Sequence, residues 1–392
     1  MSDLYRSALS ARISKLPMLP PEPDEDDEES EAADSLGSLP PPVAGIGPTT
    51  MPGTRAYASA QRKRAPNPEL TPLSASAYFA QATQIAVPDS GLDVRAYYTP
   101  PRVREGGEPG TVIVCHHGAG QSALTFALAA GEVTELSRGE CGVLALDCRG
   151  HGKTATTIPR PGPEGGEDFS IETLTSDFVN TLKVLYPDPG AAPSLLLSGH
   201  SLGGSVIVRA CPLLQDLKYR LAGVAVLDIV EEFTLEALPM MHSLLDARPA
   251  GFGSQEEAIE WHLKTNAVRN PLSARVSVPA IIQPAPEGTS PAWIWRTPLR
   301  NTAPYWTSWF TSLSKLFLTA RTARLLVLAG AERLDRELMI GQMQGKFQLT
   351  VVTGVGHMLQ EDDPRKLAEV LVEFWRRNER VVPAGVKKVG ER

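Results

Sequence analysis

Short apolar runs separated by amphipathic stretches dominate the chain from about residue 76 onward. The first two runs alternate apolar and polar residues, as half-exposed antiparallel strands do. The later runs are continuously apolar, which is typical of parallel strands buried on both faces. The pattern predicts strands at residues 84–87, 94–98, 111–116, 142–147, 194–198, 222–227, 324–330 and 347–352.

Helical periodicity fills most intervals between these runs. In residues 170–186 Thr173, Phe178, Leu182 and Leu185 recur at helical spacing, and residues 363–377 carry an apolar stripe with a proline near the first turn. Strands that alternate with helices predict an α/β fold, in which a mostly parallel central sheet has helices on both faces.

One interval interrupts this alternation. About 95 residues separate Asp228 from Arg324, far more than one crossover helix needs. The interval contains helix-like stretches at 231–247 and 255–265, a proline-rich loop at 279–291 and four tryptophans, Trp293, Trp295, Trp306 and Trp309. We therefore expect residues 229–322 to form a helical cap above the C-terminal edge of the sheet.

The N-terminal part of the chain has a different composition. Residues 1–75 are rich in Pro, Ser, Ala and acids, which predicts a disordered tail, with a catalytic domain at 76–381 and a flexible end at 382–392. Nine acids and no base lie in residues 22–34, whereas the rest of the chain has 36 acids and 38 bases. The net charge of −7 thus comes from the acidic residues at 22–34. The rest of the chain has no large excess of bases, so the sequence does not predict nucleic-acid binding.

The cysteines and the lack of targeting signals indicate the compartment. Cys115, Cys141, Cys148 and Cys211 lie in or beside apolar runs without C-x-x-C spacing, which favours buried thiols over disulfides or zinc. The first residues lack the apolar stretch of a secretory signal, and no run reaches the length of about 18 apolar residues that a membrane span needs. We expect a cytoplasmic or nuclear protein without a membrane partner.

Candidate chemistry begins at Gly199-His200-Ser201-Leu202-Gly203, directly after a predicted strand and before a predicted helix. G-x-S-x-G in this context is the nucleophile elbow of serine hydrolases, which exposes the serine hydroxyl above a sheet edge. Gly199, Gly203 and Gly204 lack a Cβ where strand and helix approach closely and where φ can be positive. Ser201 is the predicted nucleophile.

A serine nucleophile needs a base, and in this architecture the chain order is serine, acid, histidine. Three histidines follow Ser201. His242 and His262 lie on predicted helices of the inserted segment, whereas His357 lies in a glycine-containing loop between the last strand and the last helix. His357 is the predicted base.

Two aspartates are alternatives for the acid that orients this base. Asp228 ends the strand at 222–227, and Asp335 follows the next strand along the chain. Both strand ends face the predicted catalytic edge, and position alone favours Asp335.

The oxyanion hole requires two backbone N–H groups. One should come from Leu202, the residue after the nucleophile, and the other from the loop after the strand at 111–116, with Ala119 first and Gly120 next.

Several stretches of the chain together resemble the protein phosphatase methylesterases, in particular those of fungal type. The most specific are SARVS at 273–277, YWTSWF at 305–310, LSKLFL at 313–318 and IGQMQGKFQ at 340–348, and the resemblance covers most of residues 76–378. It implies the α/β-hydrolase fold. It also implies that Asp228, in the DIVE stretch, is the acid, with Asp335 as the alternative.

The resemblance implies a carboxylic ester hydrolase that demethylates the C-terminal leucine methyl ester on the catalytic subunit of type 2A protein phosphatase. The route requires no metal and no organic cofactor. Two alternatives stay open: a general small-molecule carboxylesterase or lipase of the same fold, and a protein that binds and inhibits the phosphatase.

Overall fold

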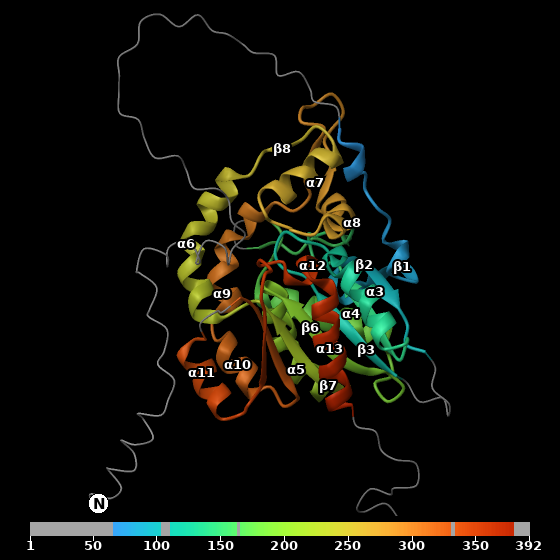
Figure 1. The fold of residues 1–392 in the computed structure, drawn as a ribbon, viewed down its shortest axis with the longest axis vertical. Coiled ribbons are helices and arrows are strands. Elements are labelled where there is room, and N and C mark those ends of the chain that lie inside the picture. The colour runs from blue at the N-terminus through green and yellow to red at the C-terminus, as the bar shows by residue number, and fades with distance from the viewer. Residues whose placement is uncertain (1–65, 103–109, 163–164, 331–333, 380–392) are drawn as a thin grey trace, which may run out of the picture.

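The computed structural model describes residues 66–102, 110–162, 165–330 and 334–379 (Figure 1). Its main sheet has the strand order β1-β2-β4-β3-β6-β7-β11-β12, with the short strand β5 paired to β2. The strands are β1 (Gln81–Val87), β2 (Leu92–Thr99), β3 (Thr111–His116), β4 (Cys141–Leu146), β5 (Ala155–Thr156), β6 (Ser194–His200), β7 (Leu221–Leu227), β11 (Arg324–Ala329) and β12 (Gln348–Val352).

The strand directions agree with the hydrophobic pattern. β1 and β2 pair antiparallel, and β2 pairs antiparallel with β4. From β4 to β12 every neighbouring pair is parallel. All eight predicted strands are present, and the predicted α/β class with a mostly parallel sheet is confirmed.

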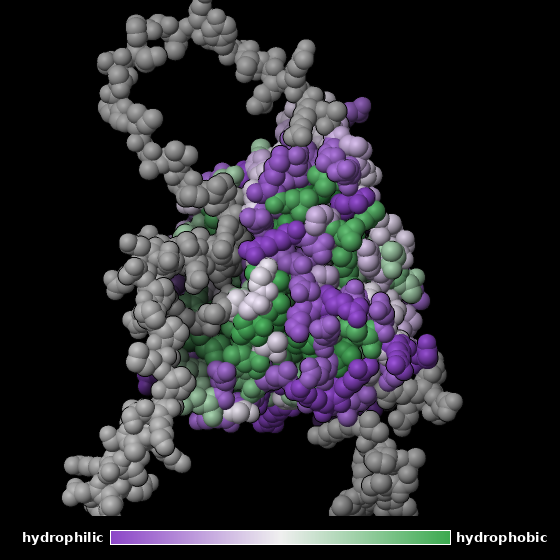
Figure 2. Space-filling view, viewed as in Figure 1, coloured by the Kyte–Doolittle hydropathy of each residue, from purple (hydrophilic) through white to green (hydrophobic). Residues whose placement is uncertain are grey.

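Helices cover both faces of this sheet because successive side chains of a strand point to opposite sides. Along β3, Val112 and Val114 join one apolar core, and Ile113 and Cys115 join the other. The first core includes α4 (Ile171–Leu185) and α5 (Leu202–Asp216), and the second includes α3 (Ala127–Leu136) and α13 (Pro364–Asn378). The outer face of α13 is hydrophilic (Figure 2).

The segment predicted as a cap, residues 229–322, lies between β7 and β11, and Figure 1 shows α7 and α8 at one end of the molecule and α6 along its side. A small antiparallel sheet of order β8-β10-β9 joins these helices. The cap elements are α6 (Glu231–Ala247), β8 (Gly251–Phe252), α7 (Gln255–Lys264), α8 (Pro271–Ile281), β9 (Ile282–Pro284), β10 (Trp293–Trp295), the 3-10 helix η6 (Leu299–Tyr305), α9 (Trp306–Phe310) and α10 (Leu313–Thr319).

The predicted proline-rich loop at 279–291 is partly wrong. Its first residues form the end of α8 and the strand β9, so the irregular part begins after Pro284. Pro279 has no N–H to donate to the Arg275 carbonyl, and that carbonyl accepts the Leu73 N–H at 2.9 Å instead.

The end of the cap is built into the hydrolase core. Trp306 and Trp309 belong to the same buried cluster as the sheet, and the Trp309 indole N–H donates to the Phe169 carbonyl at 2.8 Å. Ser205 on α5 donates to the Trp309 carbonyl. These tryptophans are therefore packed inside the molecule and are not a free surface for a partner.

The packed region begins before the predicted boundary at residue 76. The 3-10 helix η2 (Pro68–Leu70) lies before this boundary. The Leu73 N–H donates to the Arg275 carbonyl of α8 at 2.9 Å. The Arg275 side chain donates in turn to the Thr71 carbonyl at 2.7 Å. The rest of the predicted tail, at 1–65, and the predicted C-terminal tail at 382–392 lie outside the described residues.

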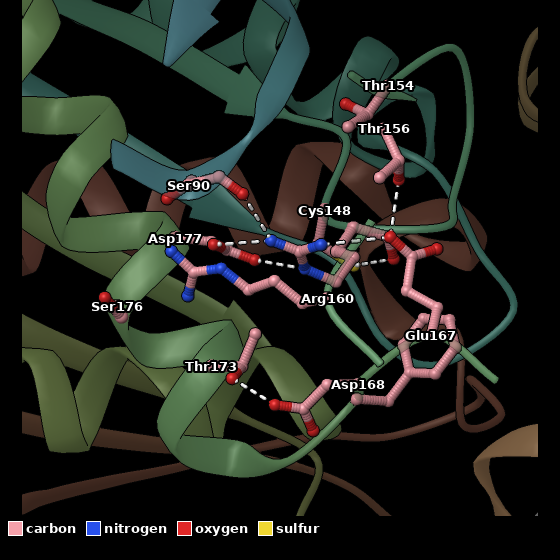
Figure 3. A network of polar contacts seen from close by, with 12 residues as sticks. Ser90, Cys148, Thr154, Thr156, Arg160, Glu167, Asp168, Thr173, Ser176 and Asp177 are labelled. Atoms are coloured by element: carbon pink, nitrogen blue, oxygen red, sulfur yellow. Dashed lines mark hydrogen bonds and ion pairs between the residues drawn. The ribbon is translucent and has the colours of Figure 1, made fainter. Parts of the chain in front are cut away.

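A buried ion network holds the loop that follows β4. The Arg149 guanidinium is fully buried and binds both carboxylate oxygens of Asp177 on α4, at 2.7 and 3.0 Å. It also donates to Glu167 and to the Ser90 carbonyl (Figure 3). Because each buried charge has a partner, the network fixes the loop against the helix layer.

The remaining helices are short, α11 (Arg336–Met343) and α12 (Leu359–Asp362). Among the described residues, no helix combines the length and apolar character that crossing a membrane requires.

Candidate active site

Ser201 occupies the sharp turn between β6 and α5. Its backbone has φ 51° and ψ −120°, an unfavourable conformation for a residue with a side chain. A Cβ on Gly199 would lie 2.3 Å from the Gly203 carbonyl oxygen, and one on Gly203 would lie 2.2 Å from the His116 carbonyl oxygen. The glycines permit close approach as predicted, but the positive φ falls on Ser201 and not on them.

His357 and Asp228 meet although 129 residues separate them. The His357 Nδ1–H donates to Asp228 Oδ2 at 2.7 Å, and the second oxygen, Oδ1, accepts the Ala329 N–H at 2.7 Å. Asp228 follows β7 and is 4% exposed. A carboxylate that accepts at Nδ1 leaves Nε2 of the neutral imidazole without a proton, which is the tautomer that a general base needs.

Asp335 has a different role in the fold. It caps the N-terminus of α11, where Oδ1 accepts the Leu338 N–H at 2.8 Å, and Oδ2 accepts the hydroxyl of Ser314 on α10. Both carboxylate oxygens thus serve the packing of two helices. The structure brings Asp228, and not the positionally favoured Asp335, onto the His357 imidazole.

The loop after β3 lies against the elbow. A Cβ on Gly118 would be 3.2 Å from Cβ of Ser201, and Ala119 lines the same cavity as the serine. The Gly120 N–H donates to His151 Nε2 at 2.9 Å, so this N–H is not free to bind an oxyanion. Leu202 begins α5, and the first N–H groups of a helix have no intrahelical acceptor. This geometry favours Ala119 over Gly120.

His200 is a further residue of the site that the sequence reasoning did not single out. Its Nε2–H donates to the His357 carbonyl at 2.8 Å, and the two rings lie 4.6 Å apart. Burial lowers the pKa of His200 well below its ordinary value, so the ring is neutral. Its place beside the nucleophile in the G-x-S-x-G motif was the only signal available.

Ser201 and His357 open into a cavity of about 170 Å³ between the sheet edge and the cap. Its walls are mostly apolar and come from α6, α7, β10 and α9, with Leu238, Met241, Trp261, Trp295 and Trp306 among them. In the described ranges, no group of three or more His, Cys, Asp or Glu side chains could hold a metal ion. The polar groups of the cavity suit attack on a carbonyl, and the walls suit an apolar acyl group.

Glu361, four residues after His357, joins the hydrolase core to the cap. Its carboxylate is 1% exposed and accepts hydrogen bonds from Thr125 Oγ1 (2.6 Å) and from Ser277 on α8. Burial is the main cause that raises its pKa from 4.5 to about 7. Since the folded pKa is above the unfolded one, the stabilisation from this carboxyl is complete below pH 4.5 and is lost as the pH rises to about 7.

We expect Glu361→Gln to flatten this pH dependence. The wild type should lose unfolding free energy when the pH rises from 5 to 8, because the Glu361 carboxyl ionises. The amide of the variant does not ionise, so the difference in unfolding free energy between variant and wild type should grow by up to about 3 kcal/mol over this range in favour of the variant. Urea unfolding at both pH values measures the difference. Glu369→Gln, on the exposed side of α13, is the control and should show no such gain; parallel wild-type and Glu361→Gln profiles would contradict the prediction.

Comparison with known proteins identifies the family. The sequence profile of the alpha/beta hydrolase family matches residues 113–370. Protein phosphatase methylesterase 1 of Cryptococcus neoformans var. neoformans serotype D is 48% identical over 341 residues, which cover 80% of each chain. The chain belongs to the protein phosphatase methylesterase family.

The methylesterase of Aspergillus oryzae is 44% identical over 288 residues, covering 72% of this chain and 66% of the relative. Among solved structures, E-2-(acetamidomethylene)succinate hydrolase superposes with a TM-score of 0.58 at 17% identity, covering 75% of this chain and 98% of that one. At this identity the likeness concerns the fold alone. This methylesterase family member is thus an α/β hydrolase in both sequence and architecture.

Proposed function

We propose that the chain is a serine esterase that removes the methyl ester from the C-terminal leucine of the type 2A protein phosphatase catalytic subunit. One observation carries the proposal: Asp228 binds His357 Nδ1 at 2.7 Å, and His357 shares a cavity with Ser201 on the elbow. The relatives' printed name, protein phosphatase methylesterase 1, supplies the substrate class. We expect the enzyme to act in the cytoplasm or nucleus.

Acylation proceeds through a tetrahedral intermediate. His357 Nε2 takes the Ser201 proton while Oγ attacks the ester carbonyl, and the N–H groups of Leu202 and Ala119 hold the oxyanion. Asp228 stabilises the imidazolium that forms. Collapse of the tetrahedral intermediate breaks the bond to the methoxy oxygen, to which His357 returns the proton, and methanol leaves.

Deacylation repeats the sequence with water. His357 deprotonates a water molecule that attacks the acyl-enzyme carbonyl, and the proton then passes to Ser201 Oγ as it leaves. The products are the free leucine carboxyl group and methanol, so one water is consumed per ester. The residues supply every proton transfer, and the route requires neither a metal nor an organic cofactor.

Methanol release from the methylated phosphatase tests the proposal. We expect rapid release from the intact subunit and about 10²-fold lower kcat/KM on its isolated C-terminal peptide methyl ester, with kcat reduced as well as KM raised. The cap forms most of the cavity wall, and remote contacts made by a folded substrate can position the ester.

A short p-nitrophenyl ester is the control substrate. If peptide, phosphatase and short ester had comparable kcat/KM values, the general-esterase alternative would be preferred. Inhibition of the phosphatase without release of methanol would instead favour the binding-protein alternative.

A further inference from the structure

Arg248 places a guanidinium in the wall of the cavity that contains Ser201. It is the first residue after α6, and its Cζ lies 5.0 Å from the ring centroid of Trp295 on β10. The Trp295 indole N–H donates to the Pro249 carbonyl at 2.8 Å. The tryptophan thus fixes the turn that carries the arginine and supports the guanidinium through a cation–π contact.

The surroundings of this guanidinium are apolar or neutral. Trp261 and Leu245 line the same cavity, and burial, with a contribution from the Arg248 charge, lowers the pKa of His262 to about 4. Burial lowers the pKa of Arg248 to about 10, so the guanidinium stays charged at neutral pH. The cavity therefore contains one permanent positive charge.

No carboxylate of the described chain pairs with Arg248, in contrast to other arginines nearby. Arg300 on the same cap binds Asp246, and the buried Arg149 binds Asp177. Arg248 is half-buried, so part of its guanidinium stays open to the cavity, where an entering carboxylate can bind it bidentately. The Arg248 guanidinium is therefore available to bind an anion that enters the cavity.

We propose that Arg248 binds an acidic side chain of the substrate close to the ester, an inference that rests on the proposed function. The reacting ester carries no charge, and the leaving group is only methanol, so the anion must belong to the acyl side. Because one cavity holds both Ser201 and Arg248, that side chain lies within the last few residues of the peptide. The substrate class is thus peptide methyl esters with an aspartate or glutamate near the C-terminus.

Short peptides that end in leucine methyl ester test this inference. One aspartate is placed at each preceding position in turn, with asparagine at the same position as the neutral counterpart. In the wild type, aspartate at one position should raise kcat/KM over asparagine by about 10- to 100-fold, the worth of a hydrogen bond between charged groups.

Arg248→Met should abolish that preference, so that its aspartate and asparagine peptides have equal kcat/KM values; the ratio is taken within each variant, so a general change in activity cancels. Arg248→Lys should keep part of the preference because the charge remains. Arg300→Met is the matched control, since it removes one positive charge from the same cap at an exposed ion pair and should keep the full preference.

Two results would overturn the inference. The first is a wild type that does not prefer aspartate over asparagine at any position, a result that does not depend on whether a variant folds. The second is an Arg248→Met variant with the same preference as the wild type. The peptides contain no phosphatase, so the outcome is separate from that of the proposed function. Methanol release from the phosphatase without a charge preference rejects the role of Arg248 alone, and a charge preference without release rejects only the phosphatase substrate.

Discussion

Ser201→Ala is expected to lower kcat by about 10⁶-fold, the order of loss found when a serine hydrolase loses its nucleophile. The elbow should keep its shape, because alanine has the same Cβ as serine and meets the same backbone conformation. Removing only Oγ deletes the attacking atom and leaves Asp228 and His357 in place. Methanol release from an ester substrate measures the loss.

Labelling with an organophosphonate gives an independent readout. The wild type should take up one label at Ser201, and Ser201→Ala should take up none. Ser205→Ala is the matched control, since Ser205 lies four residues further along on α5 but is buried and donates to the Trp309 carbonyl. It should be labelled at Ser201 like the wild type. Modification of another residue with Ser201 free would reject the assignment of the nucleophile.

Asp228→Asn is expected to lower kcat by about 10⁴-fold, the size of effect known for a triad aspartate. The Ala329 N–H requires an acceptor at the Oδ1 position, so the asparagine carbonyl should turn toward Ala329. Its NH2 group then faces His357 Nδ1, which must accept. The imidazole proton moves to Nε2, and that nitrogen can no longer take the proton of Ser201.

Asp335→Asn separates the two acids. Asparagine is as good a helix N-cap as aspartate, so α11 should lose little stability and kcat should stay close to that of the wild type. The pH profile of kcat/KM distinguishes the variants further, because of the two aspartates Asp228 is the one that contacts His357. If Asp335→Asn were the inactive variant, the acid would have to be reassigned to Asp335.

Local pattern determined much of the fold. Runs such as Thr111–His116 and Ser194–His200 are apolar on both faces because both faces are covered by helices, and that pattern can be read without neighbours. The elbow could be located for a similar reason, since a serine between glycines after a strand needs only local sterics. His357 followed from chain order.

Other features depended on which segments meet in space. The contact of Asp228 with His357 depends on β7 lying between β6 and β11, whereas position along the chain alone favoured Asp335 and the family resemblance favoured Asp228. The proline-rich stretch was expected to be a loop, yet its start is the end of α8 because tertiary packing overrides propensity.

By itself, the sequence determined the α/β class and the sharp turn at Ser201, because these depend on short-range periodicity and backbone sterics. Chain order added His357 as the expected base. The tertiary structure decided that Asp228 contacts His357, that Trp309 is buried and that Arg248 lines the cavity with no carboxylate partner in the part of the chain that the structure describes. Electrostatic partners and burial are set by residues far apart in the chain, and no local pattern records which of them come together.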